Sequence, residues 1–176
     1  MRVREVLSSS LYFVNGASVD KKALTTILRK IPYGLFIVAT ASRERSAAII
    51  ANWITQVSFK PPLIAIALEN DSNILHLLEE SRSFSINTLP SGSVAQAKRY
   101  LKSLRGDENK VSLNDFTLTD RGIPYLTGAA DVLMCSVVSR LRTGDHLLCV
   151  GEIIEWHSRS SDAILTLRES GLRYER

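Results

Sequence analysis

The sequence predicts a mainly β protein with inserted helices, in which an antiparallel sheet forms a closed or split β-barrel. Six or seven runs of strand length follow one another along the 176-residue chain, separated by turn residues. About three helical segments interrupt these runs, but they do not alternate with single strands as in a doubly wound sheet. No repeat, low-complexity segment or linker divides the chain, so residues 1–176 are expected to form one domain with its core in about residues 31–155.

Composition and charge narrow the class of protein. The apolar fraction of 45% and the charged fraction of 23% are typical of soluble globular chains, and no apolar run approaches the roughly 20 residues that span a bilayer. Residues 1–16 lack a clear signal-peptide cleavage site, and Cys135 and Cys149 lack Cys-x-x-Cys spacing, so we expect a cytoplasmic protein with buried free thiols. The net charge of +4 favours phosphate-bearing ligands without an aromatic-interleaved basic patch, so neither nucleic acid nor membrane is expected as a partner.

An N-terminal helix is predicted to begin after Ser18 or Asp20 and to end near Lys30, because Pro32 cannot continue it. Its apolar residues recur at helical spacing on one face, so we expect the helix to pack by this stripe. The stripe residues are Ala23, Leu24, Ile27, Leu28 and Ile31.

The later elements follow from apolar spacing and from Gly and Pro breaks. Short helices are expected from Ser72 and from Ser93, the second reaching about Leu104. Residues 106–122 are polar with weak periodicity and indicate a long surface loop that is mobile or touches a partner subunit. The last two strands are expected to form the longest pair. The predicted strands are residues 34–41, 46–51, 63–68, 83–88, 129–140 and 146–157.

Several common enzyme motifs are absent from the sequence. Its nine glycines form neither Gly-x-Gly-x-x-Gly nor a phosphate loop ending in Gly-Lys-Ser/Thr, which argues against a Rossmann site. The three histidines form no zinc-binding spacing, and the Gly-x-Ser-x-Gly elbow of serine hydrolases does not occur. A bound organic cofactor remains the main possibility.

Residues 51–62, with the sequence ANWITQVSFKPP, lie between two apolar runs and indicate a connection between strands. An amide, an indole and two hydroxyls within seven residues suit a ligand with a flat ring and a polar tail. The alternative is an irregular strand with a bulge, in which Trp53 and Ile54 fill the core. Both interpretations stay open on the sequence.

A flavin fits the first interpretation. Its ring system needs an apolar slot lined by backbone N–H groups, which this stretch can supply. Its phosphate needs hydroxyls, amides or a cation, which we expect from Thr55 and Ser58, from the helix start at residues 91–93, or from Lys98 and Arg99. For Lys98 and Arg99, a solvated helix face is the alternative that base rates favour.

Four segments form an ordered set along the chain. They are Ile31-Pro32-Tyr33-Gly34, residues 51–62, residues 83–89, and Gly144-Asp145-His146 leading into Gly151-Glu152-Ile153. In this order they resemble the flavin reductase-like family of FMN-binding split β-barrel proteins with Greek-key-like connections. The resemblance covers roughly residues 31–154 and implies a homodimer.

The resemblance also implies FMN held without a covalent bond by residues 52–58 and 87–89, with a nicotinamide docking over it near His146. His146 would position or polarise the nicotinamide amide, or bond the flavin edge; the alternative is a residue that caps the hairpin turn. Members often have Gly-Met-Thr where this chain has Ala48-Ile49-Ile50, and Ile54 replaces a frequent Phe. With the residue-based candidate Lys98, the expected cofactor-binding set is Ala51, Asn52, Trp53, Ile54, Thr55, Ser58, Asn87, Thr88, Leu89 and Lys98.

The implied activity is that of a flavin reductase, an oxidoreductase that transfers hydride from NADH or NADPH to FMN. Two other classes stay open. A flavoredoxin-like electron carrier would keep FMN and exchange electrons with redox protein partners. A degenerate binding protein would dimerise and hold no flavin.

Overall fold

The computed structural model describes residues 11–14, 17–43, 45–101, 115–161 and 163–172. They divide into two compact units, Met1–Pro32 and Tyr33–Arg176. Within the described ranges, no helix combines the length and apolar character needed to cross a bilayer. The single domain with its core in residues 31–155 stays a prediction.

The N-terminal unit contains a hairpin of β1 (Leu11–Val14) and β2 (Ala17–Asp20), followed by α1 (Lys21–Leu28). Asp20 caps the helix, because its Oδ1 accepts hydrogen bonds from the backbone amides of Lys22 at 2.9 Å and Ala23 at 3.2 Å. The predicted start of this helix is therefore confirmed.

The apolar stripe of α1 is not covered within its own unit, so its expected packing stays a prediction. Leu24, Ile27, Leu28 and Ile31 are all exposed, and the helix has no buried residue. The physical reason lies in the size of the unit, because a two-stranded hairpin of four-residue strands offers too little surface to cover an apolar helix face.

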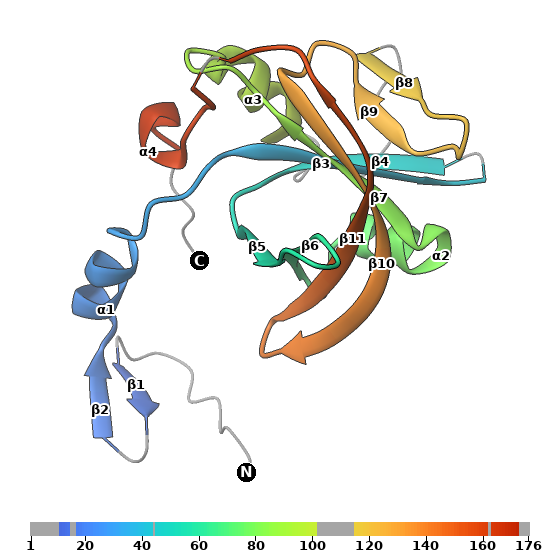
Figure 1. The fold of residues 1–176 in the computed structure, drawn as a ribbon. Helices are drawn as coiled ribbons and strands as arrows, with labels where there is room; N and C mark the ends of the chain where they lie inside the picture. Colours follow the sequence, from blue (N-terminus) through green and yellow to red (C-terminus); the bar gives the residue numbers. More distant parts are fainter. Residues whose placement is uncertain (1–10, 15–16, 44, 102–114, 162, 173–176) are drawn as a thin grey trace. The chain divides into compact units, whose positions relative to one another are not determined.

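The second unit is built on a seven-stranded antiparallel sheet with the order β4-β3-β7-β10-β11-β6-β5. Figure 1 shows β10 and β11 as one long curved hairpin. The mainly β architecture with inserted helices is confirmed, whereas closure into a barrel and dimerisation stay predictions. The strands are β3 (Phe36–Ser42), β4 (Arg45–Ala51), β5 (Ile54–Ser58), β6 (Leu63–Glu69), β7 (Ser83–Thr88), β10 (Asp131–Thr143) and β11 (His146–Ser158).

The two strands at the ends of this ladder, β4 and β5, are consecutive in the chain. Asn52 and Trp53 alone join them, so the Cα atoms of Ala51 and Ile54 are at most about 11 Å apart. The sheet must therefore curve until its two edges approach each other at this corner. The Trp53 carbonyl accepts a hydrogen bond from the Ala67 amide at 3.0 Å, which ties the link to β6.

The prediction that residues 51–62 form a connection is wrong for half of the stretch. Ile54–Ser58 is the edge strand β5, with a register shift between Gln56 and Ser58 against β6. The reason is that pairing with β6 satisfies backbone groups that a loop would leave to water. The backbone thus follows the alternative of an irregular strand with a bulge.

Three helices accompany the sheet. In α2 (Asn73–Ser81), which begins after Ser72, the predicted apolar residues Ile74, Leu75, Leu77 and Leu78 are all buried. Helix α2 packs on β3, β4 and β7, while α3 (Val94–Leu101) packs on β3 and β4. The expected end of the second helix near Leu104 lies outside the described residues.

Besides the hairpin of β1 and β2, three further elements were not predicted. A small hairpin of β8 (Phe116–Leu118) and β9 (Pro124–Leu126) includes part of the segment expected to be a loop, and α4 (Leu167–Ser170) follows near the C-terminus. The loop prediction is therefore wrong at residues 116–118, because three residues are too few to show a strand period. Residues 106–114 lie outside the described residues.

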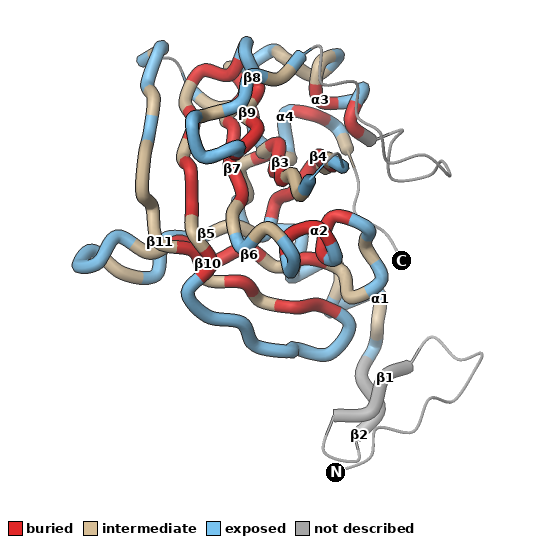
Figure 2. The backbone as a smooth tube through the Cα atoms, turned by 90° about the vertical axis from the view of Figure 1, so that its right-hand side faces the viewer, coloured by how far each residue is buried: buried red, intermediate tan, exposed pale blue. Residues whose placement is uncertain are grey.

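Consecutive residues of β3 and β7 are buried, and the tube of these strands is largely red in Figure 2. Because side chains alternate between the two faces of a strand, both faces of the sheet are covered there. One core cluster includes Val38 and Phe84 with the buried stripe of α2, and the other includes Ile37 with residues of α3 and β9. Cys135 and Cys149 are buried free thiols, as expected. Burial raises the pKa of Cys135 to about 12 and that of Cys149 to about 11.

Candidate functional site

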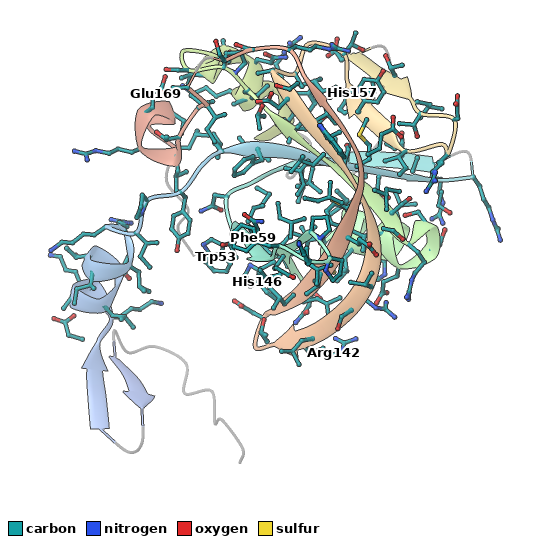
Figure 3. All side chains as sticks on the ribbon, viewed as in Figure 1. Trp53, Phe59, Arg142, His146, His157 and Glu169 are labelled. Carbon is teal, nitrogen blue, oxygen red and sulfur yellow. The ribbon has the colours of Figure 1, made fainter. Side chains whose placement is uncertain are left out.

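Two segments that are distant in the sequence meet at the corner where the sheet edges approach. The Trp53 indole, in the β4–β5 link, lies against the His146 imidazole at the start of β11, with ring centroids 4.6 Å apart and planes inclined by 43° (Figure 3). Two of the four segments that carry the family resemblance are thus in direct contact. The opposite end of β11 carries His157.

His146 is held in a defined orientation. It is 7% exposed, and its Nδ1 lies 2.6 Å from Asp145 Oδ1. A carboxylate beside Nδ1 favours the tautomer with the proton on that nitrogen, which leaves the Nε2 lone pair as an acceptor. Thr143 Oγ1 also donates to the His146 backbone carbonyl at 3.2 Å. The geometry fits both a ligand-facing role and the alternative role beside the hairpin turn.

Asn52 carries a carboxamide that makes no hydrogen bond within the described part of the fold. The residue is 4% exposed, and its carboxamide has no hydrogen-bond partner among the residues that the structure describes. Its polar atoms are not among the fully buried, unpartnered atoms of the described residues, so they keep some contact with solvent and are open to a ligand. The pyrimidine edge of a flavin alternates N–H and C=O groups, so this carboxamide fits that edge.

Apolar residues flank Asn52 in the chain and differ in their burial. Ala51 is buried, and Ile54 packs against the core, as the core-filling interpretation expected. Trp53 departs from that interpretation, because its side chain is 42% exposed. An exposed indole next to an amide without a partner in the described fold is an arrangement that suits a planar ligand. The residues therefore fit a flavin.

The candidate phosphate ligands differ in their surroundings. Thr55 is exposed on the edge strand β5 and Ser58 is half-buried after the bulge. Lys98 is exposed on α3 and makes no hydrogen bond or ion pair with the described residues, whereas Arg99 lies 3.7 Å from Asp115. Ser58 and Lys98 therefore keep side-chain groups available to an anion, whereas the Thr55 hydroxyl already donates a long hydrogen bond to the Gln56 carbonyl at 3.4 Å.

The helix start at residues 91–93 is already engaged by a carboxylate of the same chain. Ser91 Oγ donates to Glu169 Oε1 at 2.7 Å, and the Gly92 amide donates to the same oxygen at 2.6 Å. These hydrogen bonds, the Ser91 bond foremost, lower the pKa of Glu169. Two donors expected for a phosphate thus bind Glu169 in this structure.

The side chains of residues 87–89 face the interior. Asn87 Nδ2 donates to the Ile37 carbonyl and to Ser85 Oγ, both at 2.9 Å, and Oδ1 accepts from the Leu126 amide at 2.7 Å. Both donors and the acceptor of the Asn87 carboxamide are therefore used within the fold. Leu89 is fully buried in the core.

The Thr88 hydroxyl is engaged by Asp131. Its Oγ1 accepts a hydrogen bond from the Asp131 amide at 2.8 Å and donates to Asp131, with Oδ2 at 3.2 Å and the carbonyl oxygen at 3.3 Å. A flavin contact from residues 87–89 would therefore come mainly from the backbone.

Asn70 is a site residue that the sequence analysis missed. Its backbone amide donates to the Asp145 carbonyl at 3.0 Å, and Nδ2 donates to the Gly144 carbonyl at 3.1 Å. In the sequence, Glu69-Asn70-Asp71 indicates no more than the end of a strand. Its proximity to residues 144–145 follows from strand pairing between β6 and β11.

Across the described ranges, no group of three or more His, Cys, Asp or Glu side chains has a geometry suited to a metal ion.

Comparison with known proteins relates the chain to flavin-dependent proteins. A family model described as "Flavin reductase like domain" matches residues 28–175. The "Flavin reductase" of Pseudomonas putida is 25% identical over 156 residues, covering 88% of this chain and 90% of that protein. The "Putative diflavin flavoprotein A 6" of Nostoc sp. (strain PCC 7120 / SAG 25.82 / UTEX 2576) is 27% identical over 164 residues, covering 92% of this chain.

The chain spans 29% of the length of that Nostoc relative. Among solved structures, the NADH:FAD oxidoreductase SgcE6 of Streptomyces globisporus C-1027, in complex with NAD and FAD fragments, has a TM-score of 0.75. The two sequences are 23% identical, and the match covers 89% of this chain and 92% of that protein. The likeness shows a shared fold.

Proposed function

The chain belongs to the flavin reductase-like domain family, and from this premise we propose that it binds FMN and transfers hydride from NADH or NADPH to the flavin. The observation that carries the proposal is the contact between Trp53 and His146 beside the unpaired Asn52 carboxamide. This contact brings the expected flavin segment and the expected nicotinamide segment together at one corner of the sheet.

Different residues are proposed to bind different parts of the flavin. The Asn52 carboxamide bonds the polar edge of the flavin, while Ala51, Trp53 and Ile54 supply an apolar surround. Thr55, Ser58 and Lys98 are proposed to bind the phosphate, with further contacts from residues 87–89. When bound, FMN supplies the redox chemistry by accepting a hydride from the nicotinamide.

His146 is the proposed catalytic residue. Asp145 holds the proton on His146 Nδ1, so that Nε2 is free to accept a hydrogen bond from the nicotinamide carboxamide. Orientation of this kind accelerates transfer because the two reacting rings are brought into register before the reaction.

An anaerobic titration tests the proposal. Purified protein is loaded with FMN, or with FAD in a parallel sample, and NADH or NADPH is added while the visible flavin absorbance is followed. We expect rapid bleaching with at least one nucleotide. Flavin that stays oxidised with both nucleotides refutes the reductase proposal. Tight FMN binding without nucleotide oxidation would instead indicate an electron carrier. Absence of flavin binding would indicate the degenerate binding protein.

Substitution of His146 gives a narrower test. His146→Ala should slow nucleotide-driven reduction more than it weakens FMN binding, because the imidazole is proposed to orient the nicotinamide. His76→Ala is the matched control, since His76 is exposed on α2 and forms no part of the site. An unchanged reduction rate in His146→Ala would remove His146 from the site.

We also propose that the chain is a homodimer. The edge strand β5 and the turn after it expose Val57 and Phe59, and Phe59 is 84% exposed. An exposed apolar edge strand is typically covered by another chain. Sedimentation velocity of the wild type and of Phe59→Ser tests this proposal.

A further inference from the structure

The turn that precedes His146 is held from outside its own hairpin. Gly144 and Asp145 are the two residues between β10 and β11, and Gly144 has a φ of 60°. In an isolated two-residue hairpin, the carbonyls of the turn residues point outward and bond water. Here both carbonyls accept hydrogen bonds from Asn70, one from its backbone amide and one from its side chain.

The strand before Asn70 also holds the other half of the site. The Ala67 amide bonds the Trp53 carbonyl at 3.0 Å, and the register of β6 and β11 pairs Glu69 with His146. Ala67 and Asn70 therefore fix the backbone of Trp53 and the turn of His146 from one short stretch of chain. The distance between the indole and the imidazole depends on this stretch.

The Asn70 carboxamide has one productive orientation. Its Oδ1 is buried and has no hydrogen-bond partner within the described part of the chain, so the group is held through Nδ2 alone. Turning the amide over would place an oxygen against the Gly144 carbonyl oxygen. A donor is thus required at this position, and a carboxylate of the same shape would be repelled.

We propose that Asn70 is a positioning residue for the nicotinamide half of the site. By anchoring the Gly144-Asp145 turn, its side chain sets where the His146 imidazole lies relative to Trp53. The inference rests on the proposed function. It assigns to Asn70 a role in nucleotide docking that is separate from FMN binding.

Two variants and one control test this role kinetically. Asn70→Asp keeps the shape and removes the donor, Asn70→Ala removes the group, and Asn73→Ala alters an exposed asparagine at the first residue of α2. In anaerobic stopped-flow experiments with FMN-loaded protein, both Asn70 variants should need on the order of tenfold more nucleotide for half-maximal reduction. Their FMN affinity and the behaviour of Asn73→Ala should stay within about twofold of the wild type.

A second readout does not depend on activity. In the FMN-free protein labelled with 15N-histidine, the ring nitrogen shifts report the tautomer and surroundings of each histidine. Asn70→Asp should shift the His146 signals and leave those of His76 and His157 unchanged. If the wild type does not reduce FMN, the proposed function fails while this measurement still tests Asn70.

Three results would overturn the inference. The first is identical His146 ring signals in the wild type and both Asn70 variants. The second is a loss of FMN affinity as large as the loss of nucleotide affinity, which would indicate general damage to the site. The third is that neither variant is folded under the assay conditions, including Asn70→Asp, which keeps the shape of the side chain. Asn70 would then be needed for the stability of the whole fold.

Discussion

Two buried asparagines should respond in opposite ways to replacement by alanine. Asn87 is 0% exposed and its carboxamide makes three hydrogen bonds within the fold. Asn87→Ala removes the partner of the buried Leu126 amide and one partner each of the Ile37 carbonyl and the Ser85 hydroxyl. An unpaired buried group costs about 1–3 kcal/mol, so we expect the free energy of unfolding to fall by roughly 3 kcal/mol. This corresponds to a decrease of about 6–12 °C in Tm.

Asn52→Ala should leave the FMN-free protein almost as stable as the wild type. The Asn52 carboxamide has no hydrogen-bond partner among the described residues and its polar atoms keep contact with solvent, so its removal leaves no protein group unpaired and costs only a small packing contribution. We expect a change of less than about 1 kcal/mol in the free energy of unfolding. The affinity for FMN should fall by about tenfold or more, because losing one hydrogen bond to a ligand in a closed site costs about 1.4 kcal/mol or more.

The assay pairs urea denaturation of the FMN-free proteins with FMN fluorescence-quench titrations of the folded proteins. The expected pattern is a large stability loss with unchanged FMN affinity for Asn87→Ala, and the reverse for Asn52→Ala. The reasoning is refuted if Asn52→Ala unfolds as easily as Asn87→Ala. It is also refuted if Asn87→Ala, measured where it is fully folded, weakens FMN binding as much as Asn52→Ala.

Three other predictions follow from single features. FMN should quench the tryptophan emission of Trp156→Phe, which retains Trp53, more than that of Trp53→Phe; equal quenching would place the flavin elsewhere. Because hydrogen bonds lower the pKa of Glu169 below 4.5, its stabilising contribution is complete above pH 4.5 and is lost as the pH falls through the lowered value. Glu169→Gln should therefore show a weaker acid-induced fall in Tm, and an unchanged acid profile would contradict this. Gly151→Ala should lower the free energy of unfolding by about 1–3 kcal/mol, since the new Cβ would lie 2.7 Å from the Phe84 ring. A midpoint of urea denaturation equal to that of the wild type would contradict this close approach.

Local spacing predicted the elements whose apolar pattern is long enough to be unambiguous. Helix α2 and the strands β10 and β11 lie close to their predicted ranges because their patterns extend over nine or thirteen residues. The edge strand β5 was hidden within a polar stretch, because one exposed face and a bulge disrupt its alternation. The apolar stripe of α1 correctly predicted a helix, but a local pattern does not show which surface the helix packs against.

The site was predictable to a similar extent. The resemblance named both Trp53 and His146, although their contact depends on sheet curvature that no local pattern encodes. Asn87 looked like a ligand because its partners, Ile37 and Leu126, are remote in the sequence. Asn70 escaped notice for the same reason, since its role depends on the pairing of β6 with β11.

The two-residue link between β4 and β5 leaves no slack in chain length. Side chains alternate sides along a strand, so one inserted residue between Ala51 and Ile54 would turn every outward group of β5 inward, or else loosen its pairing with β6. Related chains should accordingly tolerate substitutions at Asn52 and Trp53 far better than insertions or deletions there.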